Sequence, residues 1–175
     1  GRMIIVNIST RSGVFSYIAN ELLKLTKGRP VAILVVLGIF TAVTSAFLDN
    51  VTTVILVMPI TFAIARKLEI DPIPYLLTEI FSSNIGGTAT LIGDPPNIII
   101  GSAAGFSFMD FLYNLTDIIV IILAVILIIL SFIFRKKLHA SEDKMKEVAN
   151  LDNSKTITDK KLMIRSMIVL GLVIL

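Results

Sequence analysis

Three carboxylic acids, Asp49, Glu79 and Asp94, lie inside stretches of this sequence that are otherwise apolar. An ionised side chain in the middle of a membrane-spanning helix costs about 2.5–3.5 kcal/mol on insertion scales, so such residues usually serve a function. Asn50 directly follows Asp49, and Asn97 follows Asp94 by three residues. Carboxylate and amide oxygens suit a hard cation, whereas amide and hydroxyl hydrogens suit an oxyanion. These residue types predict an ion site, in which an acid could also carry a coupling proton.

Each of the three acids also has an ordinary structural interpretation. Asp49 could cap a helix that starts at Val51, because a carboxylate accepts hydrogen bonds from the first backbone amides. Asp94 precedes two prolines and could form a turn or a cap. Glu79 could hydrogen-bond a neighbouring helix. A structural role and an ion-binding role can coexist in one residue.

The amino-acid composition indicates whether these residues belong to a soluble protein or to a membrane protein. Of the 175 residues, 55% are hydrophobic and only 17% are charged, with a mean hydropathy of +0.89. Soluble domains average about 45–50% apolar and about 25% charged residues, and a soluble domain of this length needs a larger polar surface. The sequence therefore predicts an all-α polytopic protein of the cell membrane, in contact with lipid.

Charge placement and the rare residue types exclude several function classes. The chain has no cysteine and one histidine, which excludes disulfides, thiolate metal sites, thiol nucleophiles and histidine-rich metal sites. Lys and Arg gather at the ends of the apolar blocks, which is the positive-inside pattern of membrane proteins and not a basic patch. We therefore expect no nucleic-acid partner, and no cofactor beyond a coupling ion, Na⁺ or H⁺.

Residues 31–67 predict a helical hairpin. Two uncharged arms are separated by Asp49 and Asn50, and basic residues flank both outer ends. The second arm, residues 51–65, would be about 22 Å long as a helix, against a hydrocarbon core of about 30 Å. A re-entrant hairpin, with its tip inside the membrane, explains the short arm better than two full spans.

Residues 68–112 predict a discontinuous transmembrane helix followed by an outer loop, residues 105–112. Gly86, Gly87 and Gly93 interrupt the apolar stretch, and Pro95 with Pro96 removes two backbone donors. Each apolar half would be about 20 Å long as a helix, so neither spans alone. Irregular backbone at membrane depth must be buried in protein or line a wet cavity.

The remaining segments complete the predicted organisation. Residues 1–30 contain the end of a span and an interfacial helix, and residues 113–134 form a full transmembrane helix. Residues 135–161 are polar and basic and predict a cytoplasmic linker. Residues 162–175 begin an apolar run too short to span, so the sequence is interpreted as a fragment that ends inside a helix. Two interrupted spans close together are typical of the binding site of a secondary transporter.

Two motifs in these segments resemble a known superfamily. Residues 45–53, Ser-Ala-Phe-Leu-Asp-Asn-Val-Thr-Thr, with Met-Pro-Ile at 58–60, resemble the re-entrant hairpin of the ion transporter superfamily. That superfamily includes the ArsB/NhaD arsenical pump membrane proteins and the citrate and dicarboxylate carriers. Residues 84–97, Asn-Ile-Gly-Gly-Thr-Ala-Thr-Leu-Ile-Gly-Asp-Pro-Pro-Asn, resemble its broken helix. The motifs are most similar to the melanocyte P-protein branch of the ArsB/NhaD group, and the resemblance covers about residues 10–135.

The resemblance implies an inverted-repeat carrier of which this chain is the N-terminal half. Its partners would be lipid, a small inorganic ion or solute, the second half of the transporter and, in some carriers, a second copy in a homodimer. Na⁺ would be held at Asn50, Asn84 and Asp94. Asp49 or Asp94 would carry the coupling ion, with Glu79 as a further candidate. The residues expected to line the site are Asp49, Asn50, Thr52, Thr53, Asn84, Gly86, Gly87, Thr88, Asp94 and Asn97.

The expected activity is secondary active transport by alternating access, and not an enzymatic reaction. The dicarboxylate carriers have Ser-Asn-Thr at the hairpin and Gly-Thr-Pro-Pro at the break. This chain has Leu-Asp-Asn at 48–50 and Gly-Asp-Pro-Pro at 93–96. Two added carboxylates favour a cation, a proton-coupled step or a neutral solute, as in arsenite or antimonite efflux or Na⁺/H⁺ exchange. A passive ion channel and an anion or dicarboxylate carrier are the alternatives.

Overall fold

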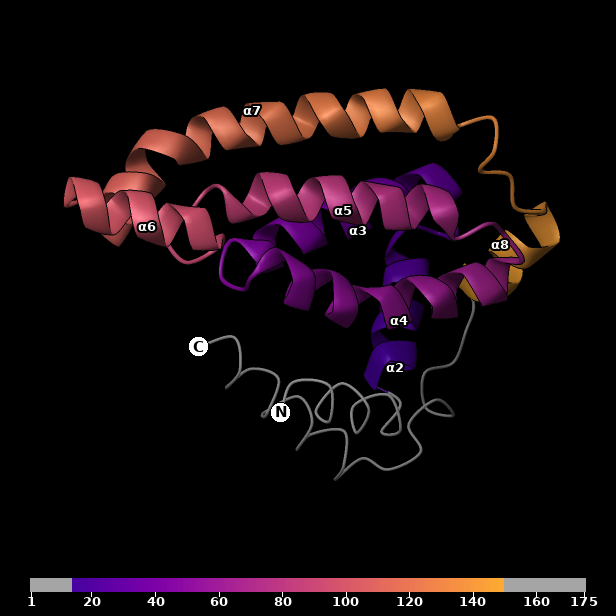
Figure 1. Ribbon diagram of the computed structural model, residues 1–175. Helices are drawn as coiled ribbons and strands as arrows, with labels where there is room; N and C mark the ends of the chain where they lie inside the picture. Colours follow the sequence, from indigo (N-terminus) through magenta and orange to yellow (C-terminus); the bar gives the residue numbers. More distant parts are fainter. Residues whose placement is uncertain (1–13, 150–175) are drawn as a thin grey trace.

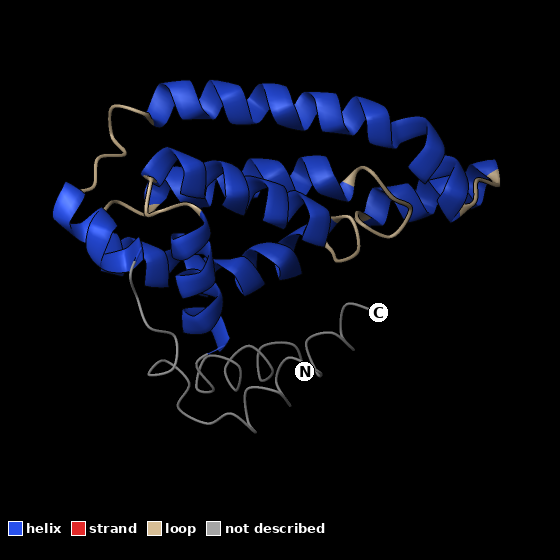
Figure 2. Ribbon diagram, turned by 180° about the vertical axis from the view of Figure 1, so that it is seen from behind, coloured by secondary structure: helices blue, strands red, loops and turns tan. Residues whose placement is uncertain are grey.

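The described part of the chain is entirely helical. The computed structural model describes residues 14–149, and no strand occurs in that range (Figures 1 and 2). The predicted all-α class is confirmed for these residues. The predictions for residues 1–13 and 150–175, including the start of a further transmembrane helix, lie outside the described residues. The helices in chain order are α2 (Val14–Leu25), α3 (Pro30–Ser45), α4 (Asn50–Leu68), α5 (Ile73–Gly87), α6 (Pro95–Ala104), α7 (Phe108–Phe134) and α8 (Glu142–Ala149).

The predicted hairpin consists of α3 and α4, joined by a turn at residues 46–49. Pro30 begins α3, where its missing amide hydrogen would have had no partner. The second arm is longer than the sequence predicts, because α4 continues through Arg66 and Lys67 to Leu68. Its 19 residues extend about 28 Å. The arms are therefore confirmed as helices, while the re-entrant placement of their tip stays a prediction.

The predicted discontinuity lies between α5 and α6. The regular helix stops at Gly87, and a new one begins at Pro95 after seven irregular residues, 88–94. Pro95 and Pro96 occupy the first turn of α6, where backbone donors have no helical partner in any case. Gly105, with a φ of 73°, ends α6 in the left-handed region.

The outer loop is shorter than predicted and covers residues 105–107 only. The reason is a capping box: the Ser107 hydroxyl accepts from the Asp110 amide at 3.3 Å, and the Ser107 amide donates to the Asp110 carboxylate at 2.7 Å. This cap begins α7 at Phe108, five residues before the predicted span. With 27 residues α7 extends about 40 Å. By length and composition α4 and α7 could each cross a membrane.

Helix α5 occupies the middle of the bundle, between α3, α4 and α7 (Figure 1). Its closest neighbour is α3, because a Cβ atom at Gly86 would lie only 2.1 Å from the Ala42 carbonyl oxygen. Small residues of this kind let two helix backbones touch, as they do in membrane proteins. The fully buried apolar side chains between the helices include Ile33, Leu37, Val57, Ile60 and Tyr75.

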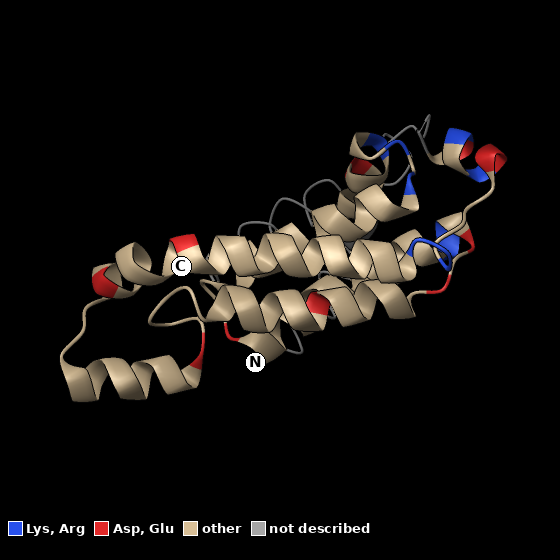
Figure 3. Cartoon of the chain, turned by 90° about the horizontal axis from the view of Figure 1, so that it is seen from above, with Lys and Arg blue, Asp and Glu red and all other residues tan. Residues whose placement is uncertain are grey.

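The bundle has one basic end. The Lys and Arg residues of the described range gather there, at and just after the ends of α2, α4 and α7 and on α8 (Figure 3). The α3–α4 turn and the break lie away from this end, and α6 extends beyond them (Figures 1 and 3).

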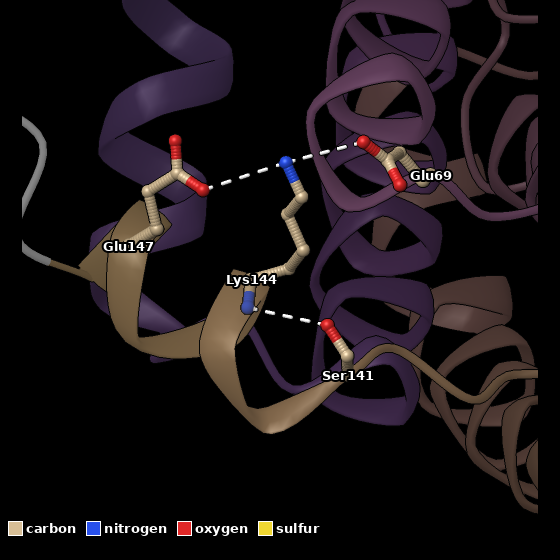
Figure 4. A network of polar contacts seen from close by, with 4 residues as sticks. All are labelled: Glu69, Ser141, Lys144 and Glu147. Atoms are coloured by element: carbon tan, nitrogen blue, oxygen red, sulfur yellow. Dashed lines mark hydrogen bonds and ion pairs between the residues drawn. The ribbon is translucent and has the colours of Figure 1, made fainter.

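Part of the predicted linker is folded, because α8 packs against α2 and α4. Val148 is 2% exposed, and Lys144 Nζ lies 3.1 Å from Glu69 Oε1 and 3.5 Å from Glu147 Oε2 (Figure 4). The hydrogen bond with Glu69, together with the nearby charge of Glu147, raises the pKa of the Lys144 ammonium.

Candidate functional site

The two interruptions of the chain lie against each other. The Thr90 hydroxyl, from the break, donates to the Ala46 carbonyl in the α3–α4 turn. The Ser45 hydroxyl donates to the Ser83 carbonyl at 2.7 Å, which ties the last residue of α3 to α5. A Cβ atom at Gly93 would lie 2.8 Å from the Ser45 carbonyl oxygen. The turn and the break therefore form one region, which we call the tip–break region.

Asn50 and Asn84 meet in this region although they are 34 positions apart. Asn50 Nδ2 donates to Asn84 Oδ1 at 3.1 Å, and the Asn84 amide donates to the Ile80 carbonyl at 2.8 Å. Asn50 Oδ1 lies 3.3 Å from the Ser45 hydroxyl. Asn84 is exposed and Asn50 is half-buried. Two of the three residues predicted to hold Na⁺ are thus in direct contact, at the edge of the bundle.

Gly87 makes this contact sterically feasible. A Cβ atom there would lie 2.4 Å from Asn50 Oδ1 and 2.9 Å from the Gly93 carbonyl oxygen, both closer than real Cβ contacts. Gly87 therefore borders the Asn50 side chain, and its predicted role in lining an ion site stays a prediction. Gly86, by contrast, faces the backbone of α3 at Ala42 and serves helix packing, which differs from the predicted lining role.

Asn97 holds the break together. Its side-chain amide lies 2.8 Å from the Thr90 carbonyl, 3.3 Å from the Gly87 carbonyl and 3.4 Å from the Thr88 carbonyl. The carbonyls at the end of a helix have no helical partner, so a buried amide that reaches them stabilises the irregular backbone. Asn97 is 9% exposed and acts as the positioning residue of the break.

Asp49 caps α4. One carboxylate oxygen accepts from the Thr52 amide at 2.9 Å and the other from the Thr52 hydroxyl at 2.6 Å. The capping interpretation of Asp49 is therefore confirmed. Thr52 has a structural role as the donor of both hydrogen bonds to this cap. The neighbouring Thr53 is fully buried, and its hydroxyl has no hydrogen-bond partner among the described residues.

Asp94 occupies the equivalent position before α6 but behaves differently. Its side chain makes no cap bond, and only its backbone carbonyl accepts from the Asn97 amide, at 3.0 Å. Asp94 is half-buried and directly follows Gly93, which contacts Gly87. The Thr88 hydroxyl donates to the Asn84 carbonyl of its own helix at 2.9 Å.

Glu79 lies apart from the tip–break region, eight residues before Gly87 on α5. It is fully buried and accepts a hydrogen bond from Thr61 of α4. The structure therefore separates this acid from Asp49 and Asp94.

An open cavity of about 560 Å³ lies between α6 and α7, next to the break. It is mostly apolar, and Asn97 links it to the tip–break region. The other residues that line it are Ile100, Phe106, Asp110, Phe111, Asn114 and Leu115. The volume lies within the range of small-molecule pockets, about 300–1,000 Å³.

Sequence reasoning missed three residues that build the region: Ser45, Ser83 and Thr90. All three lie within or next to the two motifs, and each contributes a hydroxyl or a carbonyl to a contact between the turn and the α5–α6 segment. Hydroxyl residues that flank a helix break could have identified Ser45 and Thr90. Ser83 contributes its backbone carbonyl, which no side-chain type can indicate.

Comparison with known proteins finds membrane proteins and transporters among the relatives of this chain. The chain is 44% identical over 171 residues to a "46 kDa membrane protein" of Mycobacterium leprae, covering 98% of this chain and 40% of that protein. It is 42% identical over 173 residues to an "uncharacterized transporter" of Mycobacterium tuberculosis, covering 99% and 40%. It is 47% identical over 102 residues to the human "P protein", covering 58% and 12%. The chain spans about two fifths of the length of the mycobacterial relatives.

One family matches the chain from end to end. Residues 1–175 match the family described as "Citrate transporter" (CitMHS). The names of the relatives agree with it in describing a membrane protein and transporters. The chain therefore belongs to the CitMHS citrate transporter family, whose members are membrane transporters and not enzymes.

Proposed function

We propose that this chain supplies one half of a secondary active transporter that moves a small ion or solute by alternating access, coupled to H⁺ or Na⁺. The contact between Asn50 and Asn84 carries the proposal, because it joins the two interrupted helices at one point. Interrupted helices in transporters place backbone carbonyls and half-helix ends around the substrate and the coupling ion.

The proposed site for Na⁺, as substrate or as coupling ion, uses the oxygens near this contact. Asn50 Oδ1 and Asn84 Oδ1 belong to the contacting pair, and the Asp94 carboxylate follows the break without a cap bond. A hard cation such as Na⁺ prefers this set of oxygens. The backbone carbonyls at the end of α5 would make the site more favourable for a cation, since a helix C-terminus is negative.

The proposed membrane placement puts the tip–break region inside the bilayer. From the basic end to the break, α5 extends about 22 Å, whereas α7 extends about 40 Å along the same bundle. The remaining length is taken by α6, which continues beyond the hairpin tip (Figure 1). The basic end and the linker after Phe134 are placed in the cytoplasm by the positive-inside rule.

The proposed partners follow from the apolar surface. Phe132 on α7 is 66% exposed and Ile121 is 64% exposed, so this helix would face lipid, the second half of the transporter or a second copy in a homodimer. On α5, Phe81 is 48% exposed and lies one turn from the exposed Asn84. We propose that the second half covers this face and completes the site.

For the substrate, an inorganic ion or a neutral solute of the ArsB/NhaD type is the first candidate, because Asp94 adds a carboxylate at the break. A carboxylate anion is the second candidate, and two observations favour it. The family carries the description "Citrate transporter". In addition, the Asp49 carboxylate accepts hydrogen bonds from the amide and the hydroxyl of Thr52, which partly offset its repulsion of an anion.

Transport by the full-length protein in proteoliposomes tests the proposal. Uptake of citrate, succinate, arsenite and Na⁺ is measured with an imposed pH gradient, an imposed Na⁺ gradient or neither. We expect saturable uptake of one of these that an H⁺ or Na⁺ gradient accelerates. Flux that neither saturates nor responds to a second gradient would identify a passive channel and contradict the proposal.

A further inference from the structure

Glu79 is a buried acid whose hydrogen bonding is incomplete. Its side chain is 0% exposed, and Thr61 of α4 donates a hydrogen bond to Oε1. The second oxygen, Oε2, has no hydrogen-bond partner within residues 14–149. One turn further along α5, the Ser82 hydroxyl is also fully buried and without a partner in that range.

No positive charge faces this carboxyl from the helices that pack on α5. Helix α3 contains no ionisable residue. On α4 the cations begin five residues past Thr61, and Lys67 donates to Asn20 of α2. The ionisable side chains of α4, α5 and α7, apart from Glu79, are Arg66, Lys67, Tyr75, Asp110, Tyr113 and Asp117.

The acids of α7 lie well away along the bundle, and the tyrosine of α5 is occupied. Leu127 of α7 and Ser82 of α5 both border Gly38 of α3, so the ten residues between Asp117 and Leu127 place that acid about 15 Å further along. The Tyr75 hydroxyl donates to the Pro30 carbonyl at 3.2 Å. Glu79 therefore has no counter-ion among the described residues.

An ionised carboxylate buried without a counter-ion is strongly unfavourable, so the group takes up a proton or binds a cation. A metal ion of the Na⁺ type needs several oxygen ligands, and only the Thr61 hydroxyl contacts the carboxyl here. A proton needs one oxygen, and Oε2 is unoccupied by any described donor. The surroundings thus favour the neutral acid over the metal-bound carboxylate.

We propose that Glu79 binds the coupling proton of this transporter, an inference that rests on the function proposed above. With α4 packed on α5, the proton is held on the carboxyl; when these helices separate and water enters, the carboxyl releases it to that water and becomes a carboxylate. The same helix pair holds the contact between Asn50 and Asn84 near one of its ends, whereas Glu79 and Thr61 lie closer to its middle. A change in the packing of α4 on α5 therefore links proton binding to the tip–break region.

Proton flux into liposomes that contain the full-length protein tests this role. A pH-sensitive dye records the flux after citrate, arsenite or NaCl is added to the wild type, Glu79→Gln, Glu79→Asp and Glu142→Gln. Gln keeps the shape and the bond to Thr61 but cannot ionise. Glu142 is an exposed acid on α8 and serves as the matched control.

We expect Glu79→Gln to lose at least tenfold in solute-driven proton flux, Glu79→Asp to restore part of it, and Glu142→Gln to match the wild type. Stabilisation of Glu79→Gln against heat by the same solute should persist, because the tip–break region is intact. Proton flux of Glu79→Gln equal to the wild type would overturn the proposal. A proton flux that requires Na⁺, and that Glu79→Gln lowers only by weakening Na⁺ binding, would also overturn the proposal.

Infrared spectroscopy of the purified full-length protein gives a readout that does not need transport. At neutral pH the wild type should show the carbonyl band of a buried protonated carboxyl, and Glu79→Gln should lack it. Absence of a difference between these two spectra would also overturn the proposal. If the wild type transports none of the solutes while the band is present, the proposed transport function fails and the protonation of Glu79 stands.

Discussion

Asp49 and Asp94 precede helices in the same way but differ in what their carboxylates touch. Asp49 accepts from both the amide and the hydroxyl of Thr52, whereas the Asp94 side chain makes no cap bond. The sequence could not separate these cases. Both acids are followed by residues suited to a cap, and both have extended backbone, with a φ of −63° at Asp49 and −141° at Asp94, so the difference lies in what each carboxylate contacts.

This contrast predicts that a substitution of Asp49 mainly affects stability, whereas a substitution of Asp94 mainly affects transport. Asp49→Ala should destabilise the protein by about 1 kcal/mol through loss of the cap, whereas Asp94→Asn should change stability by less than about 0.5 kcal/mol. Asp94→Asn should instead reduce gradient-coupled uptake at least tenfold. Thermal unfolding and uptake by full-length variants measure the two effects. A folded Asp94→Asn variant with wild-type coupling would remove Asp94 from the proposed site.

At the scale of helices, the interruptions could be predicted because their signals are local. An Asp-Asn pair between apolar arms indicates a turn, and Gly-Gly followed by Pro-Pro indicates a break. The contact between Asn50 and Asn84 depends on how α4 crosses α5, which no local pattern contains. The docking of α8 was missed for the same reason, since residues 142–149 are mostly polar and their packing on α2 and α4 depends on how those helices lie.

Two adjacent glycines on α5 should respond differently to alanine. At Gly86 the new methyl group would meet the α3 backbone at Ala42, which cannot move locally, so we expect a loss of about 3 kcal/mol or failure to fold. At Gly87 it would meet the Asn50 side chain, which can rotate away, and the Gly93 carbonyl oxygen at 2.9 Å, which belongs to the irregular break and needs to shift only slightly. Gly87→Ala should therefore fold with a loss of about 1 kcal/mol but lose uptake. Equal stability losses in thermal unfolding would contradict this assignment.

The docked helix α8 predicts a salt- and pH-dependent contact at the basic end. The pKa of Lys144 is raised by its bond to Glu69, so the contact is fully present below the ordinary lysine pKa and is lost as the pH rises past the raised value. Lys144→Gln should speed hydrogen exchange of α8 amides at neutral pH, and high salt should have the same effect on the wild type. Exchange that responds to neither change would show that packing of Val148 alone holds α8.

For the whole molecule, the sequence predicts one half of a membrane transporter, and the family match confirms that the chain belongs to a transporter family. Composition indicates the membrane, and the two motifs indicate where the helices fail. The complete site cannot be predicted from either, because the chain covers about 40% of its mycobacterial relatives, and we propose that the remainder covers the exposed face around Asn84. The proposed function requires that the turn and the break act as one site.

A double-mutant cycle of Asn50→Ala and Asn84→Ala in the full-length protein tests this claim most directly, with solute uptake into proteoliposomes as the measurement. Residues in contact show coupling energies of about 0.5–3 kcal/mol, whereas distant ones add within about 0.5 kcal/mol. We predict that the double variant loses little more uptake than either single variant. Asn50→Ala combined with Glu142→Gln, at the opposite end, should behave additively. Additive losses for Asn50 and Asn84, or single variants with wild-type uptake, would contradict a shared site.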